Sequence, residues 1–383
     1  MEETVENLVS FNVGDRLEVE IADMAFGGDG VGKVDGFVVF VPFVIVGEVA
    51  LVEITERKSD FARARLLQVI TPSPDRVDPK CQYFGECGGC QYQHIDYEAQ
   101  GRIKLEQVRN IFARVGGFAP EVVGELIPCP SPYGYRNRIM IRRQWDKFQQ
   151  KAIYGFLRAE SRLVVDLERC EIAEEALNEQ LQQVREDPPP RNMQKVVLRM
   201  MPDDWEMHPD SFFQNNFSLL PKLVETVRSR LADASTKYLV DAYCGIGFFS
   251  LSMADLVEGF VGIDIDKQCI LPARKNLAAR GIENGEFVQG KTEEHMDAML
   301  ERFPADDTTL ILDPPRKGVH KEGLEMLANA KPRQVIYVSC HPATLARDLK
   351  WLCEQGYELK SVTALDMFPQ TQHVECVADL RRT

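Results

Sequence analysis

The stretch Tyr238-Leu-Val-Asp-Ala-Tyr-Cys-Gly-Ile-Gly-Phe-Phe-Ser250 decides the fold of the C-terminal part of this chain. Residues 238–241 have the apolar character of a buried strand, residues 245–247 form a Gly-Ile-Gly turn, and a helix is predicted over residues 248–256. Glycines in such a turn let a ligand approach the backbone close to a helix N-terminus. The third glycine of the dinucleotide fingerprint is absent, so the turn favours a nucleoside without phosphates.

The sequence around this stretch alternates regularly between strand and helix patterns from about Lys237 onwards. Further strands are predicted over residues 260–265, 286–289, 309–312 and 335–339. Such alternation is typical of a parallel, doubly wound sheet with helices on both faces, a Rossmann-like fold. Residues 358–365 and 374–380 are predicted to pair as an antiparallel hairpin at the edge of that sheet.

Asp264 ends the second predicted strand, about 20 residues after the first strand. A carboxylate at this place can bind both hydroxyls of a ribose. The glycine turn and the carboxylate together are what a methyltransferase needs to bind S-adenosylmethionine. The alternative interpretation is an ordinary α/β turn followed by an aspartate that caps a helix.

Two motifs follow later strands and are expected at the carboxyl edge of the sheet, where ligands bind in open α/β folds. In Asp313-Pro-Pro-Arg-Lys-Gly318, two prolines stiffen the loop and leave Asp313 projecting. In Val338-Ser-Cys-His341, Cys340 precedes a proline suited to a first helical turn. We expect the helix N-terminus to lower the pKa of this thiol. A buried structural cysteine is the alternative.

Methylation of C5 of uracil is a reaction that these residues can perform. C5 is a poor nucleophile in the free base, but a thiolate that adds to C6 makes the ring an enolate whose C5 can attack a sulfonium methyl. A base must then remove the C5 proton so that the thiolate can leave. We predict Cys340 as the nucleophile and Glu375 as the base, with an exposed strand carboxylate as the alternative for Glu375. The target in a folded RNA would have to be flipped out of its stack.

The N-terminal region has five short alternating strand patterns between Gly14 and Val69, bounded by Gly-rich turns. This pattern predicts a small closed barrel of the oligonucleotide-binding kind. Residues 71–79 are predicted to be a linker, residues 97–115 a helix, and residues 122–200 a mixed, largely β region.

The net charge of −14 is unusual for a protein that binds nucleic acid, because phosphates require Lys and Arg. Two segments nevertheless concentrate positive charge, and solvated faces are the alternative interpretation of both. They contain Arg57, Lys58, Arg63 and Arg65, and Arg136, Arg138, Arg142 and Arg143. Apolar runs stay well short of the 18 or so residues of a membrane span, and the start Met1-Glu-Glu-Thr4 has no signal-peptide character. We therefore expect a cytoplasmic protein without membrane contact or an obligate protein partner.

Three of the ten cysteines form the motif Cys81-x5-Cys87-x2-Cys90. With a distant fourth thiol, for which Cys170 is the best candidate, this spacing fits an iron-sulfur cluster held by four cysteines. The five residues between Cys81 and Cys87 are more than normally separate a pair of zinc ligands. Structural zinc is therefore the less favoured alternative. A structural or RNA-positioning role is expected.

Taken together, these motifs resemble the RNA 5-methyluridine methyltransferase family. The resemblance is to the branch with an N-terminal TRAM domain and a 4Fe-4S cluster that acts on 23S ribosomal RNA, and it covers nearly the whole chain. The motifs that carry it are Cys81-x5-Cys87-Gly-Gly-Cys90 with Cys170, Ser211-Phe-Phe-Gln214, Tyr243-Cys-Gly-Ile-Gly247, Asp313-Pro-Pro-Arg316, Ser339-Cys340 and His373-Val-Glu375.

The resemblance implies a role for each matching residue. Cys340 would be the nucleophile and Glu375 the proton acceptor. The cofactor S-adenosylmethionine would be contacted by Gln214, Tyr243, Asp264 and Asp313, and the 4Fe-4S cluster would be held by Cys81, Cys87, Cys90 and Cys170.

The resemblance also implies a multi-domain α/β protein. Its expected parts are an OB-like TRAM barrel over residues 1–72, a central mixed α+β domain with the cluster over 73–205, and a Rossmann-like methyltransferase domain over 206–383. The barrel and cysteines favour 23S rRNA as the substrate. The T-loop uridine of tRNA is the first alternative, and a catalytically inactive RNA-binding assembly factor is the second.

Overall fold

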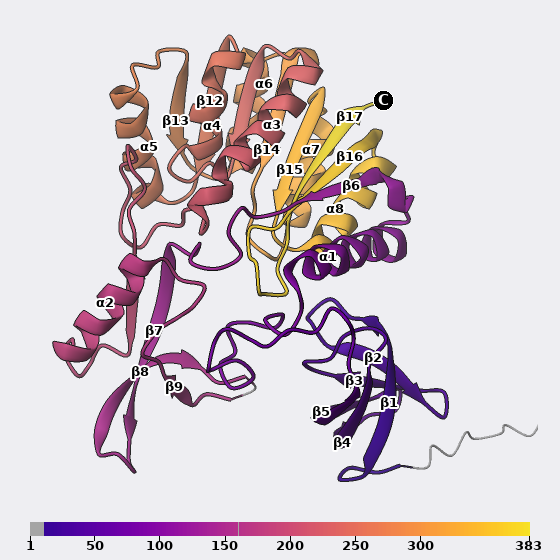
Figure 1. Ribbon diagram of the computed structural model, residues 1–383. Coiled ribbons are helices and arrows are strands. Elements are labelled where there is room, and N and C mark those ends of the chain that lie inside the picture. The colour runs from indigo at the N-terminus through magenta and orange to yellow at the C-terminus, as the bar shows by residue number, and fades with distance from the viewer. Residues whose placement is uncertain (1–10, 160) are drawn as a thin grey trace, which may run out of the picture.

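The computed structural model describes residues 11–159 and 161–383, so the acidic start at residues 1–4 lies outside the described residues. Figure 1 shows three parts: a large α/β layer structure at the top, a small barrel at the lower right and a smaller sheet at the lower left. Helix α1 (Tyr97–Ile111) lies between the α/β layer structure and the barrel.

The N-terminal part is a closed five-stranded barrel, as the sequence predicted. Its strands follow the order β1-β2-β3-β5-β4. They are β1 (Arg16–Met24), β2 (Gly30–Val34), β3 (Phe37–Val41), β4 (Val49–Arg57) and β5 (Phe61–Thr71). The tight interior explains the glycines of β2, because a Cβ on Gly32 would lie 2.3 Å from Cγ1 of Val19. Alternating residues such as Val19 and Ile21 fill the barrel core.

The middle of the chain contributes a four-stranded antiparallel sheet. Its order is β10-β7-β8-β9, and helix α2 packs on one face. The elements are β7 (Arg138–Asp146), β8 (Lys151–Leu157), β9 (Val164–Asp166), α2 (Glu175–Glu186) and β10 (Lys195–Arg199). The predicted helix over 97–115 is α1, which begins at its N-cap Asp96 and continues as a π-helical turn over Phe112–Gly116.

The C-terminal part is built on an eight-stranded sheet with the order β13-β12-β11-β14-β15-β17-β16-β6. The first five strands of that order are parallel, which confirms the doubly wound prediction. The strands are β6 (Val123–Ile127), β11 (Tyr238–Ala242), β12 (Gly259–Asp264), β13 (Gly285–Gln289), β14 (Thr308–Leu312), β15 (Gln334–Ser339), β16 (Tyr357–Leu365) and β17 (Glu375–Arg382).

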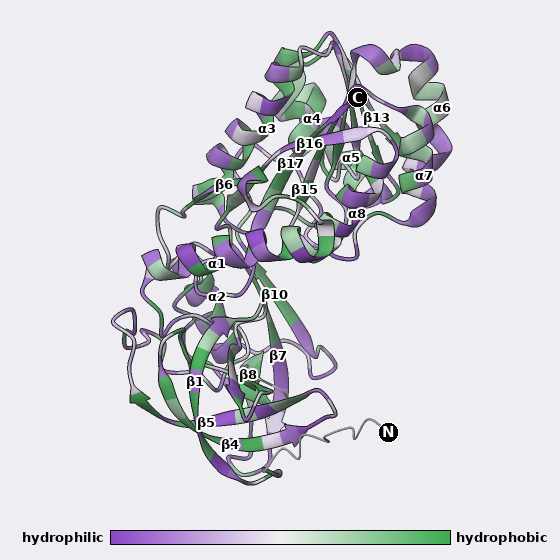
Figure 2. Ribbon diagram, turned by 90° about the vertical axis from the view of Figure 1, so that its right-hand side faces the viewer, coloured by the Kyte–Doolittle hydropathy of each residue, from purple (hydrophilic) through white to green (hydrophobic). Residues whose placement is uncertain are grey.

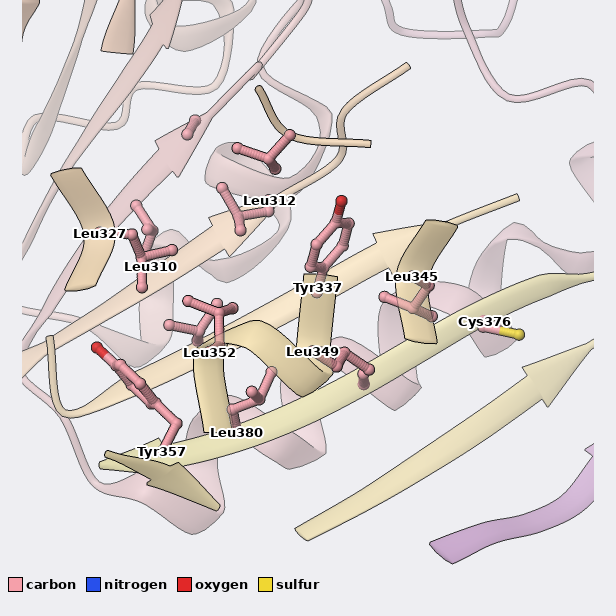
Figure 3. Close-up of a cluster of buried hydrophobic side chains, with 14 of the residues drawn as sticks. Leu310, Leu312, Leu327, Tyr337, Leu345, Leu349, Leu352, Tyr357, Cys376 and Leu380 are labelled. Carbon is pink, nitrogen blue, oxygen red and sulfur yellow. The ribbon is translucent and has the colours of Figure 1, made fainter. Parts of the chain in front are cut away.

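Helices cover both faces of this sheet, and Figure 2 shows its hydrophobic strands lying between their partly hydrophilic helices. One face carries α3 (Leu220–Ala234), α4 (Phe248–Met253) and α5 (Lys267–Ala279). The other carries α6 (Thr292–Arg302), α7 (Lys321–Ala330) and α8 (Pro342–Glu354), together with α1. Figure 3 shows how Leu345, Leu349 and Leu352 of α8 pack on Tyr337 of β15 and Leu380 of β17.

The position of the C-terminal hairpin differs from the prediction. Strands β16 and β17 do pair antiparallel, but β17 inserts beside β15 and β6 pairs with the outer side of β16. The edge is therefore β6, a segment more than 200 residues earlier in the chain. Short-range periodicity identified the strands but could not reveal this distant partner. Both α1 and β6 lie N-terminal to residue 205 and pack with the C-terminal sheet.

Within the described residues, no helix has both the length and the apolar character that crossing a membrane requires.

Candidate active site

The turn between β11 and α4 lies at the carboxyl edge of the sheet. Tyr243, Gly245 and Gly247 all have positive φ, of 65°, 56° and 87°. Behind the turn, Asp241 is fully buried, and its Oδ2 accepts hydrogen bonds from the backbone N (2.9 Å) and Oγ (2.6 Å) of Ser250. Burial raises the pKa of Asp241 to about 7. This pairing ties the first turn of α4 to the end of β11.

Asp264 stands at the end of β12, beside the glycine turn. Its Oδ2 accepts the N–H of Gly245 at 2.9 Å and its Oδ1 accepts the N–H of Asp266 at 2.8 Å. Burial raises its pKa, and these backbone donors oppose the rise. The predicted ribose-binding carboxylate is therefore held in one orientation against the turn.

Asp313 follows β14, where the sequence placed it. It is partly buried in front of the Pro314-Pro315 pair. Burial, with a smaller contribution from the charge of Asp241, raises the pKa of Asp313 to about 7. A carboxyl group in this state can hold or release a proton near neutral pH.

Cys340 follows β15 and lies just before α8, as predicted, but its thiol is not acidified. Burial, followed by the negative charge of Glu375, raises the pKa of Cys340 to about 12. Arg316 opposes this rise. The expected lowering by the helix N-terminus is therefore wrong for the free protein, because desolvation and nearby carboxylates outweigh the helix.

Glu375 begins β17 and is 3% exposed, so it is not the exposed strand carboxylate of the alternative interpretation. Ser339 pairs in register with Cys376 across β15 and β17, which places Cys340 and Glu375 side by side at the ends of neighbouring strands. Burial, followed by the charge of Asp313, raises the pKa of Glu375 well above its ordinary value. The predicted nucleophile and base thus come from segments 35 positions apart and meet at one edge.

A cavity of about 590 Å³ lies at this edge of the sheet, and its volume is within the range of small-molecule sites. It brings together all six residues predicted for catalysis and cofactor binding: Gln214, Tyr243, Asp264, Asp313, Cys340 and Glu375. Aromatic side chains of Phe212, Phe213, Phe248 and Phe249 form much of the apolar wall. Such a wall suits the faces of planar bases.

Several cavity residues were not assigned a role from the sequence. Asn215 lines the cavity, and its buried Oδ1 has no hydrogen-bond partner among the described residues. Arg316 donates a hydrogen bond of 3.0 Å to Nδ1 of His373, whose pKa falls to about 4 through burial and nearby cations. Phe368 packs edge-on against His373. These residues lie on loops that have no periodic pattern. Only their closeness in sequence to the recognised motifs could have indicated them.

The barrel also reaches this edge of the sheet. Phe26, in the β1–β2 loop, packs edge-on against His341, the residue after the predicted nucleophile, with ring centroids 5.9 Å apart. No local pattern predicts this contact, because it joins two parts of the chain that are far apart in sequence.

The four predicted cluster ligands line a second cavity, of about 460 Å³, between the cysteine segment and the central sheet: Cys81, Cys87, Cys90 and Cys170. Burial raises the pKa of Cys87 to about 11, with further contributions from Cys170 and Cys81. The described residues contain no group of three or more His, Cys, Asp or Glu that could hold a single metal ion.

The two basic segments differ in the structure. In the barrel, Lys58 pairs with Glu56 and Arg65 with Glu53, as expected for a solvated face. The other salt bridges of this barrel segment are Arg63 with Asp29 and Arg63 with Glu56.

The central sheet has the opposite arrangement. Arg138 lies opposite Arg199, and Arg142 opposite Lys195, on paired strands. Within residues 11–159 and 161–383, no salt bridge to a carboxylate involves these four cations.

Two known families match this chain, one at each end. Residues 192–383, half of the chain, match the tRNA (Uracil-5-)-methyltransferase family, and residues 10–67 match the TRAM domain. The barrel described above is thus a TRAM domain.

Individual relatives match almost the full length. An uncharacterized RNA methyltransferase of Nostoc sp. is 30% identical over 97% of each chain. The tRNA (uracil(54)-C(5))-methyltransferase of Schizosaccharomyces pombe is 30% identical over 98% of this chain and 80% of its own length. The solved Pyrococcus abyssi tRNA (uracil-54, C5)-methyltransferase, in complex with S-adenosyl-L-homocysteine, is 27% identical, with a TM-score of 0.72 over 95% of this chain and 99% of that chain. This chain therefore belongs to the tRNA (Uracil-5-)-methyltransferase family and is an RNA (uracil-C5)-methyltransferase.

Proposed function

We propose that the chain methylates C5 of a uridine in RNA through a covalent bond between Sγ of Cys340 and C6 of the base. The observation that carries this proposal is the meeting of Cys340, Glu375 and Asp313 in one cavity of about 590 Å³. When bound there, S-adenosylmethionine supplies the electrophilic methyl group.

The chain's own residues account for the remaining steps. The Cys340 thiol passes its proton to the carboxylate of Asp313, whose pKa of about 7 lets it hold that proton, and the sulfur adds to C6, which makes C5 nucleophilic enough to take the methyl group. The proton on C5 then passes to a carboxylate oxygen of Glu375, its bonding electrons form the C5–C6 double bond, and the C–S bond breaks to release the thiolate. The raised pKa of Glu375 makes it a stronger base than an ordinary carboxylate.

The same cavity supports the predicted cofactor contacts. We assign the ribose hydroxyls to Asp264, because its carboxylate is fixed at the turn beside Gly245. Gln214, Tyr243 and Asp313 line the rest of the cofactor side. The solved relative that matches 95% of this chain contains S-adenosyl-L-homocysteine, the product of methyl donation, which supports this use of the cavity.

A mechanism-based trap tests the covalent step. RNA with 5-fluorouridine at the target has no C5 proton to lose, so the wild-type enzyme should form a stable complex with it in the presence of S-adenosylmethionine. Cys340→Ala should form none while binding the cofactor normally. Cys353→Ala, which removes a similarly half-buried thiol from α8 outside the cavity, is the matched control and should form the complex. Complex formation by Cys340→Ala would refute the assignment.

The names of two relatives bear on which RNA this chain methylates. The sequence favoured 23S rRNA because of the barrel and cysteines. However, the solved tRNA enzyme matches 95% of this chain, and therefore most of the barrel, so the barrel does not separate the two substrates. The yeast relative named above is also a tRNA uracil-54 enzyme. These two relatives support the T-loop uridine of tRNA, with a 23S rRNA uridine as the second candidate.

Tritium release from C5 of uridine distinguishes the tRNA target from the 23S rRNA target. The purified enzyme would be given tRNA and 23S rRNA fragments that carry tritium at C5 of uridine. We expect faster release from tRNA, abolished by replacing the T-loop uridine. Release from an rRNA fragment alone would reverse the order of the two candidates.

We further propose that Cys81, Cys87, Cys90 and Cys170 hold a 4Fe-4S cluster. The four thiols line one cavity, and the ligand set would require deprotonated sulfurs, which iron stabilises. When bound, the cluster would tie the cysteine segment to the central sheet. Anaerobically purified wild-type protein should be brown with about four irons per chain, and Cys170→Ser should lose the colour. One zinc and no iron would refute this assignment, and Cys129→Ser, outside this cavity, is the control.

The RNA itself is proposed to lie on the face of the central sheet that carries Arg138, Arg142, Lys195 and Arg199. Like charges opposite each other on paired strands are unfavourable unless an anion lies between them. Nε of Arg138 and Nη2 of Arg199 have no hydrogen-bond partners among the described residues, so the protein does not balance these guanidinium groups, and RNA phosphates would supply the missing negative charge. The same Arg199 donates to the backbone oxygen of Ser211 at 2.6 Å, and the next residue, Phe212, lines the cavity.

The division into residues 1–72, 73–205 and 206–383 remains a proposal for the folding units. Limited proteolysis tests it, and we expect cuts near residues 72 and 205. Because α1 and β6 pack with the C-terminal sheet, their release with the central fragment would support the division, and their retention with the C-terminal fragment would move its second boundary.

A further inference from the structure

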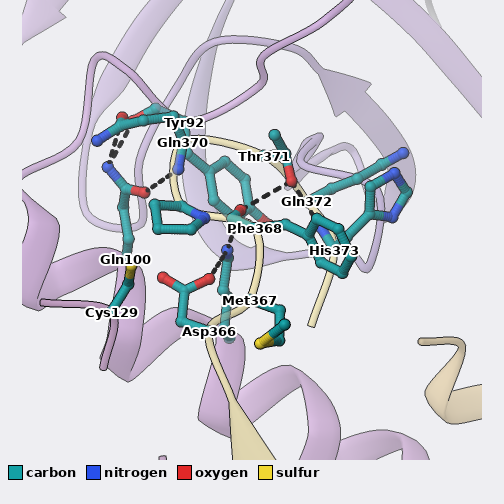
Figure 4. Close-up of polar contacts among 12 residues, drawn as sticks. Tyr92, Gln100, Cys129, Asp366, Met367, Phe368, Gln370, Thr371, Gln372 and His373 are labelled. Atoms are coloured by element: carbon teal, nitrogen blue, oxygen red, sulfur yellow. Dashed lines mark hydrogen bonds and ion pairs between the residues drawn. The ribbon is translucent and has the colours of Figure 1, made fainter. Parts of the chain in front are cut away.

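The loop between β16 and β17, residues 366–374, leads directly into Glu375, and many of the hydrogen bonds that hold it come from segments in the first half of the chain. Figure 4 shows its polar contacts. The backbone N–H groups of Gln91 and Tyr92 both donate to the carbonyl of Gln370 at 3.0 Å. The hydroxyl of Tyr135 donates to the carbonyl of Pro369 at 2.9 Å.

Gln100 on α1 makes the most specific of these contacts. Nε2 of Gln100 donates to Oε1 of Gln370, and the backbone N of Gln370 donates to Oε1 of Gln100, both at 3.0 Å. Its Nε2 also donates to the carbonyls of Tyr92 and Ile95. Gln100 is fully buried, so these hydrogen bonds have no competition from water.

Lys104, one helical turn further along α1, holds the start of the same loop. Its Nζ donates to Oδ1 of Asp366 at 2.6 Å and to the carbonyl of Phe368 at 3.0 Å, and both charged side chains are fully buried. A buried pair of this kind contributes a fixed geometry more reliably than net stability.

The loop needs such external support because its own conformation is unfavourable. Gln370 has a φ of 67°, which is uncommon for a residue other than glycine, and is 2% exposed. Three residues later, His373 lines the cavity, and Glu375 follows at the start of β17. The loop therefore joins directly to the first residue of β17, where the pairing of Glu375 with Leu365 is the last rung of the ladder, so a loosened loop would free this strand end and the carboxylate of Glu375.

We propose that Gln100 and Lys104 are positioning residues for the proton-removal step. They fix the loop so that Glu375 lies within reach of the C5 proton once the methyl group has been transferred. The inference rests on the proposed role of Glu375. It implies that loosening the loop slows the departure of Cys340 from the base more than the formation of the covalent bond.

The test uses the full-length protein with Gln100→Met, which removes both bonds to Gln370 without adding a charge. Gln107→Met is the matched control. Gln107 is also a buried glutamine on α1, but its side chain bonds to Tyr92 Oη and to carbonyls of the barrel loop, and not to residues 366–374. Both variants should bind S-adenosyl-L-homocysteine like the wild type.

Two readouts separate positioning from general destabilisation. With RNA tritiated at C5 of uridine, Gln100→Met should lower kcat for tritium release about ten-fold or more, the scale of one lost positioning hydrogen bond, with KM nearly unchanged. On denaturing gels taken during turnover, more of this variant than of wild type should be covalently linked to RNA. Gln107→Met should show neither effect.

Equal slowing by both variants without covalent complex would overturn the inference. Glu375→Gln is the reference: if it accumulates complex and Gln100→Met does not, only the positioning role fails. If Glu375→Gln turns over normally, the base assignment and this inference both fail. Should Gln100→Met not fold, Gln370→Gly removes the same side-chain contact at a backbone position that glycine tolerates, and the same two outcomes apply.

Discussion

Cys340, the proposed nucleophile, lies in surroundings that suppress its ionisation. The thiol is partly buried beside two carboxyl groups, which raises its pKa to about 12, and Arg316 provides the main opposing charge. Thiolate formation in the free enzyme is therefore rare at neutral pH, which protects the sulfur from other electrophiles.

This setting predicts a pH dependence for the free enzyme. Because only the thiolate reacts, alkylation of Cys340 by iodoacetamide should rise about ten-fold per pH unit and show no plateau up to about pH 9. Mass spectrometry of the Cys340 peptide gives the rate without interference from other thiols. A plateau near pH 7 would mean that the thiol is acidic after all.

The charge of Arg316 predicts a companion result. Arg316→Gln removes the cation that lowers the pKa of Cys340, so alkylation at any one pH should slow by about ten-fold. Lys317→Gln removes a neighbouring exposed cation that has no such effect on Cys340 and is the control. Similar rates for the two variants would show that Arg316 does not influence the thiol.

Asp241 predicts a dependence of stability on pH. Its pKa rises from 3.8 to about 7 on folding, so between these values the folded state holds a proton that the unfolded state has lost. This group's contribution to stability is fully present below pH 3.8, falls as pH rises and levels off above pH 7. Asp241→Asn should therefore gain stability relative to wild type between pH 5 and about 7 in thermal unfolding. A constant difference across this range would contradict the shift.

At the scale of elements, the β11–α4 turn shows which glycines the fold requires. Gly245 and Gly247 both have positive φ, but a Cβ on Gly245 meets open space, whereas one on Gly247 would lie 2.5 Å from the ring of Phe287. A side chain would strain the backbone at both positions, but its Cβ would clash with a neighbour only at Gly247.

The prediction is a difference between two alanine variants. Gly245→Ala should cost about 1 to 2 kcal/mol of unfolding free energy from the left-handed backbone. Gly247→Ala should cost more, about 3 kcal/mol or above, because Phe287 must also move. Urea unfolding measures both. Equal costs would mean that the ring yields freely.

Much of this element level was predictable from sequence. The barrel strands, the parallel strands and the helix after the glycine turn follow from alternation and turn residues, which act over a few positions. The edge strand β6 did not, since it is separated from β16 by more than 200 residues. Five of the six cavity residues were predicted because each lies in a compact motif, and Asp264 because it ends the second strand, whereas Asn215, Phe368 and Phe26 became visible only in three dimensions.

At the scale of the whole molecule, the distribution of charge matters more than its total of −14. Three cations of the barrel segment, Lys58, Arg63 and Arg65, are paired with carboxylates, while those on the central sheet face one another. RNA binding is therefore expected to depend on the central sheet.

Salt dependence tests this expectation. Replacing Arg142 and Lys195 together by Gln should weaken RNA binding and reduce the slope of log K against log salt by about 0.7 to 0.9 for each charge. The double change Lys58→Gln with Arg65→Gln removes the same charge from the barrel and is the control. An equal loss from both pairs would place the RNA on the barrel as well.

The sequence by itself determined the element types, the motifs and the chemistry that a cysteine and a glutamate could perform, because these follow from local spacing and side-chain identity. Tertiary structure alone decided that β17 lies beside β15, which puts Cys340 next to Glu375, and that α1 holds the loop before Glu375. It also set the raised pKa values of these two groups. The physical reason is that burial, register and charge proximity depend on contacts between residues distant in sequence, which no local pattern encodes.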